Sequence, residues 1–241
     1  MSKINVSVDC VIFGFDDIEK KLKVLTIEKK VDPFSKKNKK RTQFAIPGDL
    51  IELEEDIDAA ASRVLFSLTK LNKLYLKQFK TFGHPRRVQQ EKDKEWLENF
   101  RSNPDERVIT IAYVSIVRME DYNPEASYFA QDVKWTNIEE IPELAFDHNQ
   151  IVNEAVDFLR KEINHEVTSE LLPRKFTLSQ LQELYEIILN EKLDKRNFRK
   201  QIMSKGVVEK TNEKQRVFLT NQRNYTSLIN SNCFSLLSFL T

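Results

Sequence analysis

Charged side chains with a regular spacing begin at residue 49 and run into a helical segment. Asp49 stands six residues before Glu55, and Glu55 stands eight residues before Arg63. Carboxylates at positions i, i+3 and i+4 of a helix share one face and can converge on a metal ion, and magnesium prefers such hard oxygen ligands. The residues after Arg63 therefore decide whether this segment could build a magnesium site.

The segment resembles a Nudix box, the motif of enzymes that hydrolyse nucleoside diphosphates. The family pattern is Gly, five residues, Glu, seven residues, then Arg-Glu-aliphatic-x-Glu-Glu-x-Gly-aliphatic. The chain keeps Glu55, Arg63, Leu65 and Leu71. The remaining motif positions are replaced: Asp49 stands for the first Gly, Val64, Ser67 and Leu68 stand for the three helix glutamates, and Lys70 stands for the late Gly.

The replaced glutamates are the expected metal ligands. Without a metal, the developing charge on a diphosphate loses its main stabiliser and the attacking water loses its activator. We therefore predict that the chain is not an enzyme and holds neither a metal nor a cofactor. The alternative is a hydrolase in which Glu52, Glu54 or residues 88–107 supply the carboxylates. Glu55 and Arg63 are predicted to form an ion pair that anchors a loop.

Composition places the chain among globular proteins. It has 241 residues, of which 40% are hydrophobic and 31% charged, and its two cysteines give no disulfide framework, so we expect a cytoplasmic protein. The formal net charge of +1 is unevenly distributed: residues 171–241 contain 12 basic and 6 acidic residues, which leaves 26 and 31 for residues 1–170. A basic C-terminal part points weakly to nucleic acid.

Hydrophobic periodicity predicts a mixed α/β domain followed by a small helical one. In the C-terminal part, two helices and two short extended pieces follow one another, which is the order of a winged helix-turn-helix. The expected strands are 5–15, 23–27, 75–82, 108–117 and 130–135, with a short extended piece at 43–46. The expected helices are 57–71, 92–100, 146–163, 178–189 and 195–205, and the hairpin strands are 207–211 and 216–220.

Most of the chain resembles the Nudix-related transcriptional regulators, bacterial proteins that join a Nudix-like domain to a C-terminal winged helix. The resemblance includes 80-KTFGHPRR-87, 104-PDERVITIAYVSIV-117 and 146-FDHNQIV-152, and is most specific in 173-PRKFTLSQLQELYEIILNEKLDKRNFRKQI-202. It implies an α+β chain with a Nudix-like mixed-sheet α/β/α sandwich at 1–165, a linker at 166–174 and a winged helix-turn-helix domain at 175–241. Known members sense ADP-ribose or, in the Bacteroidetes branch that this chain resembles most, L-arabinose.

The helix expected at 195–205 is the predicted recognition helix. Its first turns carry basic and amide side chains, while Phe198 and Ile202 face inward. Arginine can pair with guanine and asparagine with adenine, whereas lysine mostly meets phosphate. We predict base contacts by Arg196, Asn197 and Arg199, and phosphate contacts by Lys195, Lys200, Thr177, Ser179, Gln180, Lys214 and Arg216.

Effector binding is expected in the Nudix-like domain. Asp49 and Glu55 lie at the former catalytic mouth, and Arg107 precedes the clearest strand. The segment with His84, Arg86 and Arg87 resembles the family's FG-x-P-x-R motif, and arginine suits phosphate or sugar hydroxyls. Because a sugar needs several convergent polar groups, these six residues are the predicted effector contacts.

The leading hypothesis is a ligand-responsive regulator, expected as a repressor of carbohydrate genes, that binds operator DNA as a homodimer. A pentose, another sugar derivative or ADP-ribose would release it, with a sugar favoured by the resemblance. Two alternatives are a Nudix hydrolase of ADP-ribose or a related diphosphate, and a winged-helix adaptor for protein partners.

Overall fold

The computed structural model describes residues 4–29, 43–100, 103–163, 171–173, 175–206, 208–215 and 223–228. The chain forms two compact units, Met1–Lys161 and Glu162–Thr241. The basic loop at 36–41 and most of the expected linker lie outside the described residues. No helix in the described ranges is long and apolar enough to cross a membrane.

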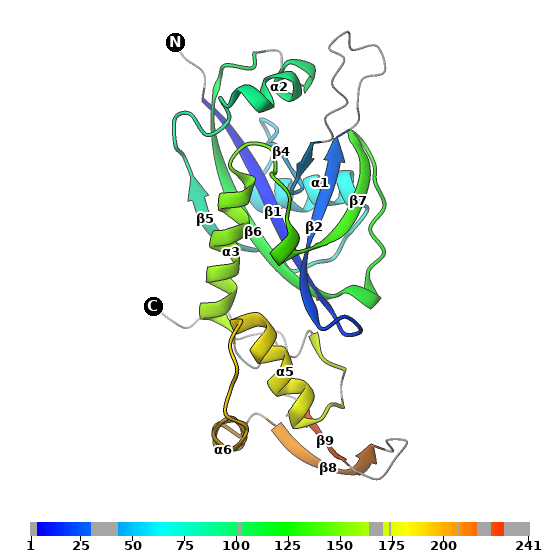
Figure 1. Cartoon of the computed structure of the whole chain (residues 1–241). Coiled ribbons are helices and arrows are strands. Elements are labelled where there is room, and N and C mark those ends of the chain that lie inside the picture. The colour runs from blue at the N-terminus through cyan, green and yellow to red at the C-terminus, as the bar shows by residue number, and fades with distance from the viewer. Residues whose placement is uncertain are drawn as a thin grey trace. The chain divides into compact units, whose positions relative to one another are not determined.

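Unit 1 is built on a seven-stranded mixed sheet (Figure 1). Its main path runs β3-β2-β1-β6-β5, with β4 paired to β1 and β7 paired to β2. The central strands β1 and β6 are parallel, and the other pairs are antiparallel. The strands are β1 Ile4–Asp16, β2 Lys21–Lys29, β3 Phe44–Ala45, β4 Gly48–Leu50, β5 Lys77–Phe82, β6 Arg107–Arg118 and β7 Ala130–Asn137.

Two helices cover opposite faces of this sheet, α1 (Ile57–Thr69) behind it and α3 (His148–Glu162) in front of it in Figure 1. Alternate residues of a strand point to opposite faces. Val8, Cys10 and Ile12 of β1 therefore pack in one apolar cluster with α1. The residues between them face α3, whose buried stripe is Ile151, Val152, Ala155, Val156 and Leu159.

The long charged segment after β5 folds onto unit 1. It contains the short helices η1 (Glu91–Asp93) and α2 (Lys94–Phe100), in agreement with the helix expected at 92–100. The Trp96 ring lies 6.1 Å from Phe129 and 5.7 Å from Phe146, both edge-on. These contacts attach the segment to the sheet and to the entrance of α3. Two further short helices, η2 (Met119–Asp121) and η3 (Ile138–Glu140), flank β7.

Unit 2 has the expected order of helix, turn, helix and hairpin. It contains α5 (Leu178–Leu189), α6 (Lys195–Ser204), β8 (Val208–Gln215) and β9 (Arg223–Leu228). The strand expected at 216–220 falls outside the described residues, and the strand paired with β8 begins at Arg223. Leu184, Ile188 and Phe198 are buried, and the Tyr185 ring lies 5.4 Å from that of Phe198, so an apolar seam joins α5 to α6.

Candidate functional site

The remnant of the Nudix box forms a surface ion pair that anchors a loop. Arg63 Nε donates to Glu55 Oε1 at 2.6 Å and Arg63 Nη2 donates to Glu55 Oε2 at 2.8 Å. Arg63 Nη2 also donates to the Leu50 carbonyl at 3.1 Å. Hydrogen bonding to Arg63 lowers the pKa of Glu55 below its usual value. The predicted anchoring pair is therefore present.

The three positions that hold glutamates in the motif carry side chains without a carboxylate. Val64 and Leu68 are fully buried in the apolar cluster of unit 1. The Ser67 hydroxyl donates to the Val64 carbonyl at 3.0 Å. Among the residues that the structure describes, His, Cys, Asp and Glu side chains form no group of three or more that could hold a metal ion.

Lys70 occupies the position of the motif's late glycine and keeps its backbone conformation. It caps the end of α1 with φ +60°, in the left-handed region that favours glycine, and its N–H donates to the Phe66 carbonyl at 2.9 Å. The backbone at this position thus has a conformation that suits glycine, although the side chain is that of lysine.

The predicted effector residues divide between the two faces of the sheet. Asp49 pairs with Val8 in the β1–β4 ladder, so both point toward α1. Asp9 pairs with Gly48 and points toward α3, where it meets Arg87. Asp49 and Glu55 therefore do not join Arg87 in one site, and an effector contact by these two residues stays a prediction.

Arg87 is the centre of a buried network of charged side chains on the α3 face. Its Nε and Nη2 donate to the two carboxylate oxygens of Asp147 at 2.8 and 2.7 Å, and Nη2 also donates to Asp9 at 3.2 Å. The Arg87 side chain is only 3% exposed. Its prediction as a direct effector contact is therefore corrected, because this arginine organises the interior.

Asp9 and His148 extend this network to the turn before β4. The Ile46 N–H donates to His148 Nδ1 at 3.2 Å, so a neutral imidazole carries its proton on Nε2, which lies 3.5 Å from Asp9 Oδ1. Burial alone would raise the pKa of Asp9, but His148 and Arg87 hold it well below its usual range. A Cβ on Gly48 would lie 2.0 Å from Asp9 Oδ1, so only glycine fits there.

A second buried carboxylate lies at the entrance of α3. Asp93 Oδ2 accepts a hydrogen bond from the Phe146 N–H at 2.9 Å, and burial raises the pKa of Asp93. Within the described part of the chain, Asp93 Oδ1 is buried without a hydrogen-bond partner. Sequence reasoning missed Asp9 and Asp93, because a lone aspartate in a strand or a loop gives no signal of its own, and it predicted Asp147 only as the cap of α3.

His84, Arg86 and Arg107 remain on the surface around Arg87. His84 and Arg86 are exposed in the turn after β5, where the Arg86 N–H donates to His84 Nδ1 at 3.2 Å. Arg107 is exposed at the start of β6 and donates to the Gly83 carbonyl at 3.1 Å. These three predicted residues therefore do lie near one another.

The helix caps of unit 2 agree with the sequence, and they involve two of the predicted phosphate contacts. Thr177 and Gln180 form a reciprocal capping box, and Asp194 caps α6 by accepting from the Asn197 N–H at 2.8 Å. Thr177 is 3% exposed and its hydroxyl is held in the cap. The Thr177 and Gln180 side chains thus act as caps in this structure, and their phosphate contacts stay predictions.

The exposed side chains of α6 include four of the five predicted in this helix, and Arg199 is the exception. Arg196, Asn197 and Lys200 are exposed opposite Phe198 and Ile202, and Lys195 is exposed nearer the seam. Arg199 is half-buried, and its Nη2 lies 3.4 Å from the Ser179 hydroxyl of α5. Its assignment to bases is thereby weakened. Lys214 lies in β8, and Arg216 lies outside the described residues.

Comparison with known protein families finds a match for the C-terminal part of the chain. Residues 168–223 match the NrtR DNA-binding winged helix domain. The matched residues include α5, α6 and β8 of unit 2. It is 28% identical over 213 residues to the ADPR responsive transcriptional repressor NtrR of Acinetobacter baylyi, covering 86% of this chain and 76% of that protein.

Solved structures support the fold of the whole chain. NrtR of Shewanella oneidensis in complex with a 27mer DNA matches with a TM-score of 0.64 and 22% identity over 93% of both chains. A MutT/nudix family protein of Enterococcus faecalis matches with a TM-score of 0.69 and 20% identity, covering 95% of this chain and 88% of that chain. The expected Nudix-like sheet followed by a winged helix is thus confirmed.

Proposed function

We propose that the chain is a transcriptional regulator that binds operator DNA through α6 and is released by a small effector bound in unit 1. The observation that carries this proposal is the match of residues 168–223 to a DNA-binding winged helix domain. The exposed Arg196, Asn197 and Lys200 at the start of α6 support it, because this end of a recognition helix enters the major groove.

ADP-ribose is the first effector to test. Its support is the relative from Acinetobacter baylyi, whose name describes an ADPR-responsive repressor. Exposed His84, Arg86 and Arg107 offer groups for its phosphates or ribose hydroxyls. L-arabinose and other pentoses remain predictions from the family resemblance, as do the homodimer and a role in carbohydrate metabolism.

Titration of the whole protein with DNA from upstream of its own gene and with an unrelated duplex tests the DNA-binding part. Arg196→Ala should weaken binding to the upstream DNA by about 1–3 kcal/mol and reduce the preference over the unrelated duplex. Lys200→Ala should weaken binding to both duplexes alike and reduce the salt slope by about 1.

Lys192→Ala is the matched control, since Lys192 is an exposed lysine of unit 2 that pairs with Glu186 outside α6. It should leave both affinities unchanged. Equal affinity of the unaltered protein for the two duplexes at every salt concentration would refute operator recognition.

A further inference from the structure

The turn after β5 places exposed and buried groups next to one another in the chain. His84 and Arg86 are exposed, whereas Arg87 and Val88 are buried. The Arg87 N–H donates to the His84 carbonyl at 3.1 Å, which closes the turn. The backbone of the exposed His84 is thus tied directly to that of the buried Arg87.

Arg87 holds the start of α3 in a defined position. Both oxygens of Asp147 accept from its guanidinium, and this paired geometry fixes orientation as well as distance. Asp147 directly precedes α3, and its carbonyl accepts the helical hydrogen bond from the Ile151 N–H at 3.1 Å. The position of Arg87 is thus tied to the first turn of α3.

Residues 90–93 give the same helix entrance a second attachment. Lys92 Nζ donates to the Leu144 carbonyl at 2.7 Å, and Asp93 accepts from the Phe146 N–H. Phe146 has φ +55°, a left-handed conformation that a bulky residue keeps only when its surroundings hold it. The backbone at the entrance of α3 therefore depends on the segment that follows β5.

α3 connects this entrance with the end of unit 1. Its 15 residues span about 22 Å, and its apolar stripe lies against the sheet. The helix ends at Glu162, the residue at which unit 2 begins. A packed helix moves as a body, so a shift of its first turn would reach the end of α3, where unit 1 ends in the sequence.

We propose that Arg87 and Asp147 are positioning residues that couple residues 83–93 to DNA binding through α3. This inference rests on the proposed function. Effector contact at His84 and Arg86 changes the Arg87–Asp147 contact and shifts the population of α3 positions. By linkage, DNA binding must in turn alter residues 83–93.

Amide hydrogen exchange of the whole protein with and without its upstream DNA tests this coupling and needs no known effector. In the unaltered protein, DNA should change exchange in residues 83–93 and in the first turn of α3 by about fivefold or more. Asp147→Asn should still bind DNA but lose that change. Arg87→Lys keeps the charge without the paired geometry, and it should behave in the same way.

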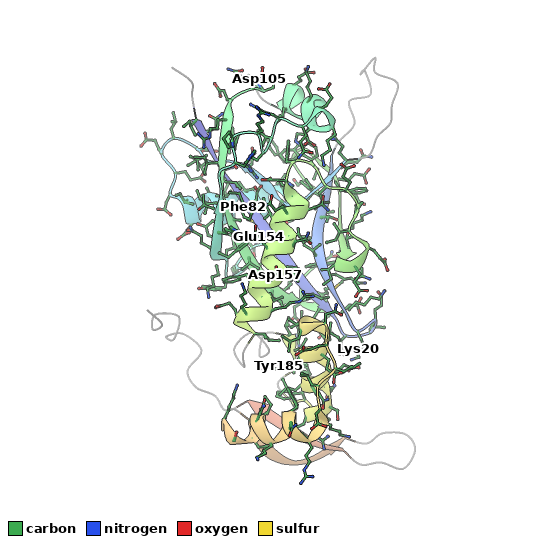
Figure 2. The ribbon with its side chains drawn as sticks, turned by 60° about the vertical axis from the view of Figure 1, so that its left-hand side comes forward. Lys20, Phe82, Asp105, Glu154, Asp157 and Tyr185 are labelled. Atoms are coloured by element: carbon green, nitrogen blue, oxygen red, sulfur yellow. The ribbon has the colours of Figure 1, made fainter. Side chains whose placement is uncertain are left out.

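Glu154→Gln is the matched control, because Glu154, labelled in Figure 2, is a surface residue of α3 that pairs with Lys80 of β5. It removes an ion pair that joins β5 to the middle of α3, away from the entrance of the helix, and should retain the DNA-induced change. If both Asp147→Asn and Arg87→Lys retain the DNA-induced change in exchange, the coupling role is refuted. It is also refuted if both variants accelerate exchange by the same factor with and without DNA, because the two residues would then only stabilise the fold. Absence of DNA binding by the unaltered protein would instead refute the proposed function.

Discussion

Two arginine–carboxylate pairs with the same hydrogen-bond geometry lie on opposite faces of the sheet, and they differ in their surroundings. Arg63 and Glu55 on the α1 face form a pair in which the Arg63 side chain is 33% exposed. Arg87 and Asp147 on the α3 face form a pair in which the Arg87 side chain is 3% exposed. The carboxylates are similarly exposed, at 14% for Glu55 and 12% for Asp147, so the two pairs differ in the exposure of the arginine, and water screens the exposed cation more than the buried one.

The two pairs also differ in how many parts of unit 1 they connect. The surface pair keeps the residues of the Nudix box and anchors one loop. The buried pair, with Asp9 and His148, connects β1, the turn before β4, the segment after β5 and the start of α3. We therefore expect the surface pair to contribute less to the stability of the folded state than the network around Arg87.

Removal of Arg87 should have the largest effect on stability. Arg87→Ala leaves the buried Asp9 and the half-buried Asp147 without their cation, so the free energy of unfolding of unit 1 should fall by about 3–5 kcal/mol. Urea unfolding followed by tryptophan fluorescence measures it. A loss below about 1 kcal/mol would place Arg87 in the same class as the surface pair.

Asp9→Asn should lower the free energy of unfolding by an amount that depends on pH. The folded-state pKa of Asp9 is depressed, so its ionised form stabilises the fold above the unfolded pKa of about 4 and this contribution is lost as the pH falls. The variant should lose about 2 kcal/mol or more at pH 7. The difference from the unaltered protein should shrink below about pH 4, and a difference independent of pH would contradict the assignment.

Glu55→Gln should have a small effect if the surface pair is only a loop anchor. We expect only a small loss in the free energy of unfolding, reduced further by salt, because water screens this pair. Denaturation at low and high salt checks this. A loss comparable with that of Arg87→Ala would remove the distinction between the two pairs.

Lys70→Gly restores the residue of the motif and should be the mildest change. Relief of the left-handed backbone at φ +60° favours the variant, while the lost contact of Lys70 with the Phe66 ring and the freer unfolded chain oppose it. A net gain of about 0.5 kcal/mol is expected from thermal unfolding. A clear destabilisation would show that the Lys70–Phe66 contact dominates.

Periodicity predicted most of the elements from sequence, because buried faces impose it. The strands at β1, β5 and β6 and the helices at α1, α3, α5 and α6 follow their apolar patterns closely. The short strand β4 was not predicted, since its three residues gain their place from pairing with β1. Local patterns do not encode such a partner.

The candidate site was harder to predict, because it depends on which face of the sheet each residue occupies. Arg87 and Arg86 are neighbours with equal chemistry, yet one is buried between two carboxylates and the other is exposed. Asp9 reads as a polar interruption in an apolar strand until its register with Gly48 is known. Arg199 likewise reads as a base contact until its contact with Ser179 is seen.

The most direct test of the proposed regulator is a titration of ADP-ribose, and separately of L-arabinose, into the preformed complex with its upstream DNA, with the compound recovered and analysed afterwards. The proposal predicts that one compound releases the DNA and is recovered intact. Release by neither compound, or magnesium-dependent hydrolysis of ADP-ribose, would contradict an effector-responsive regulator without Nudix turnover.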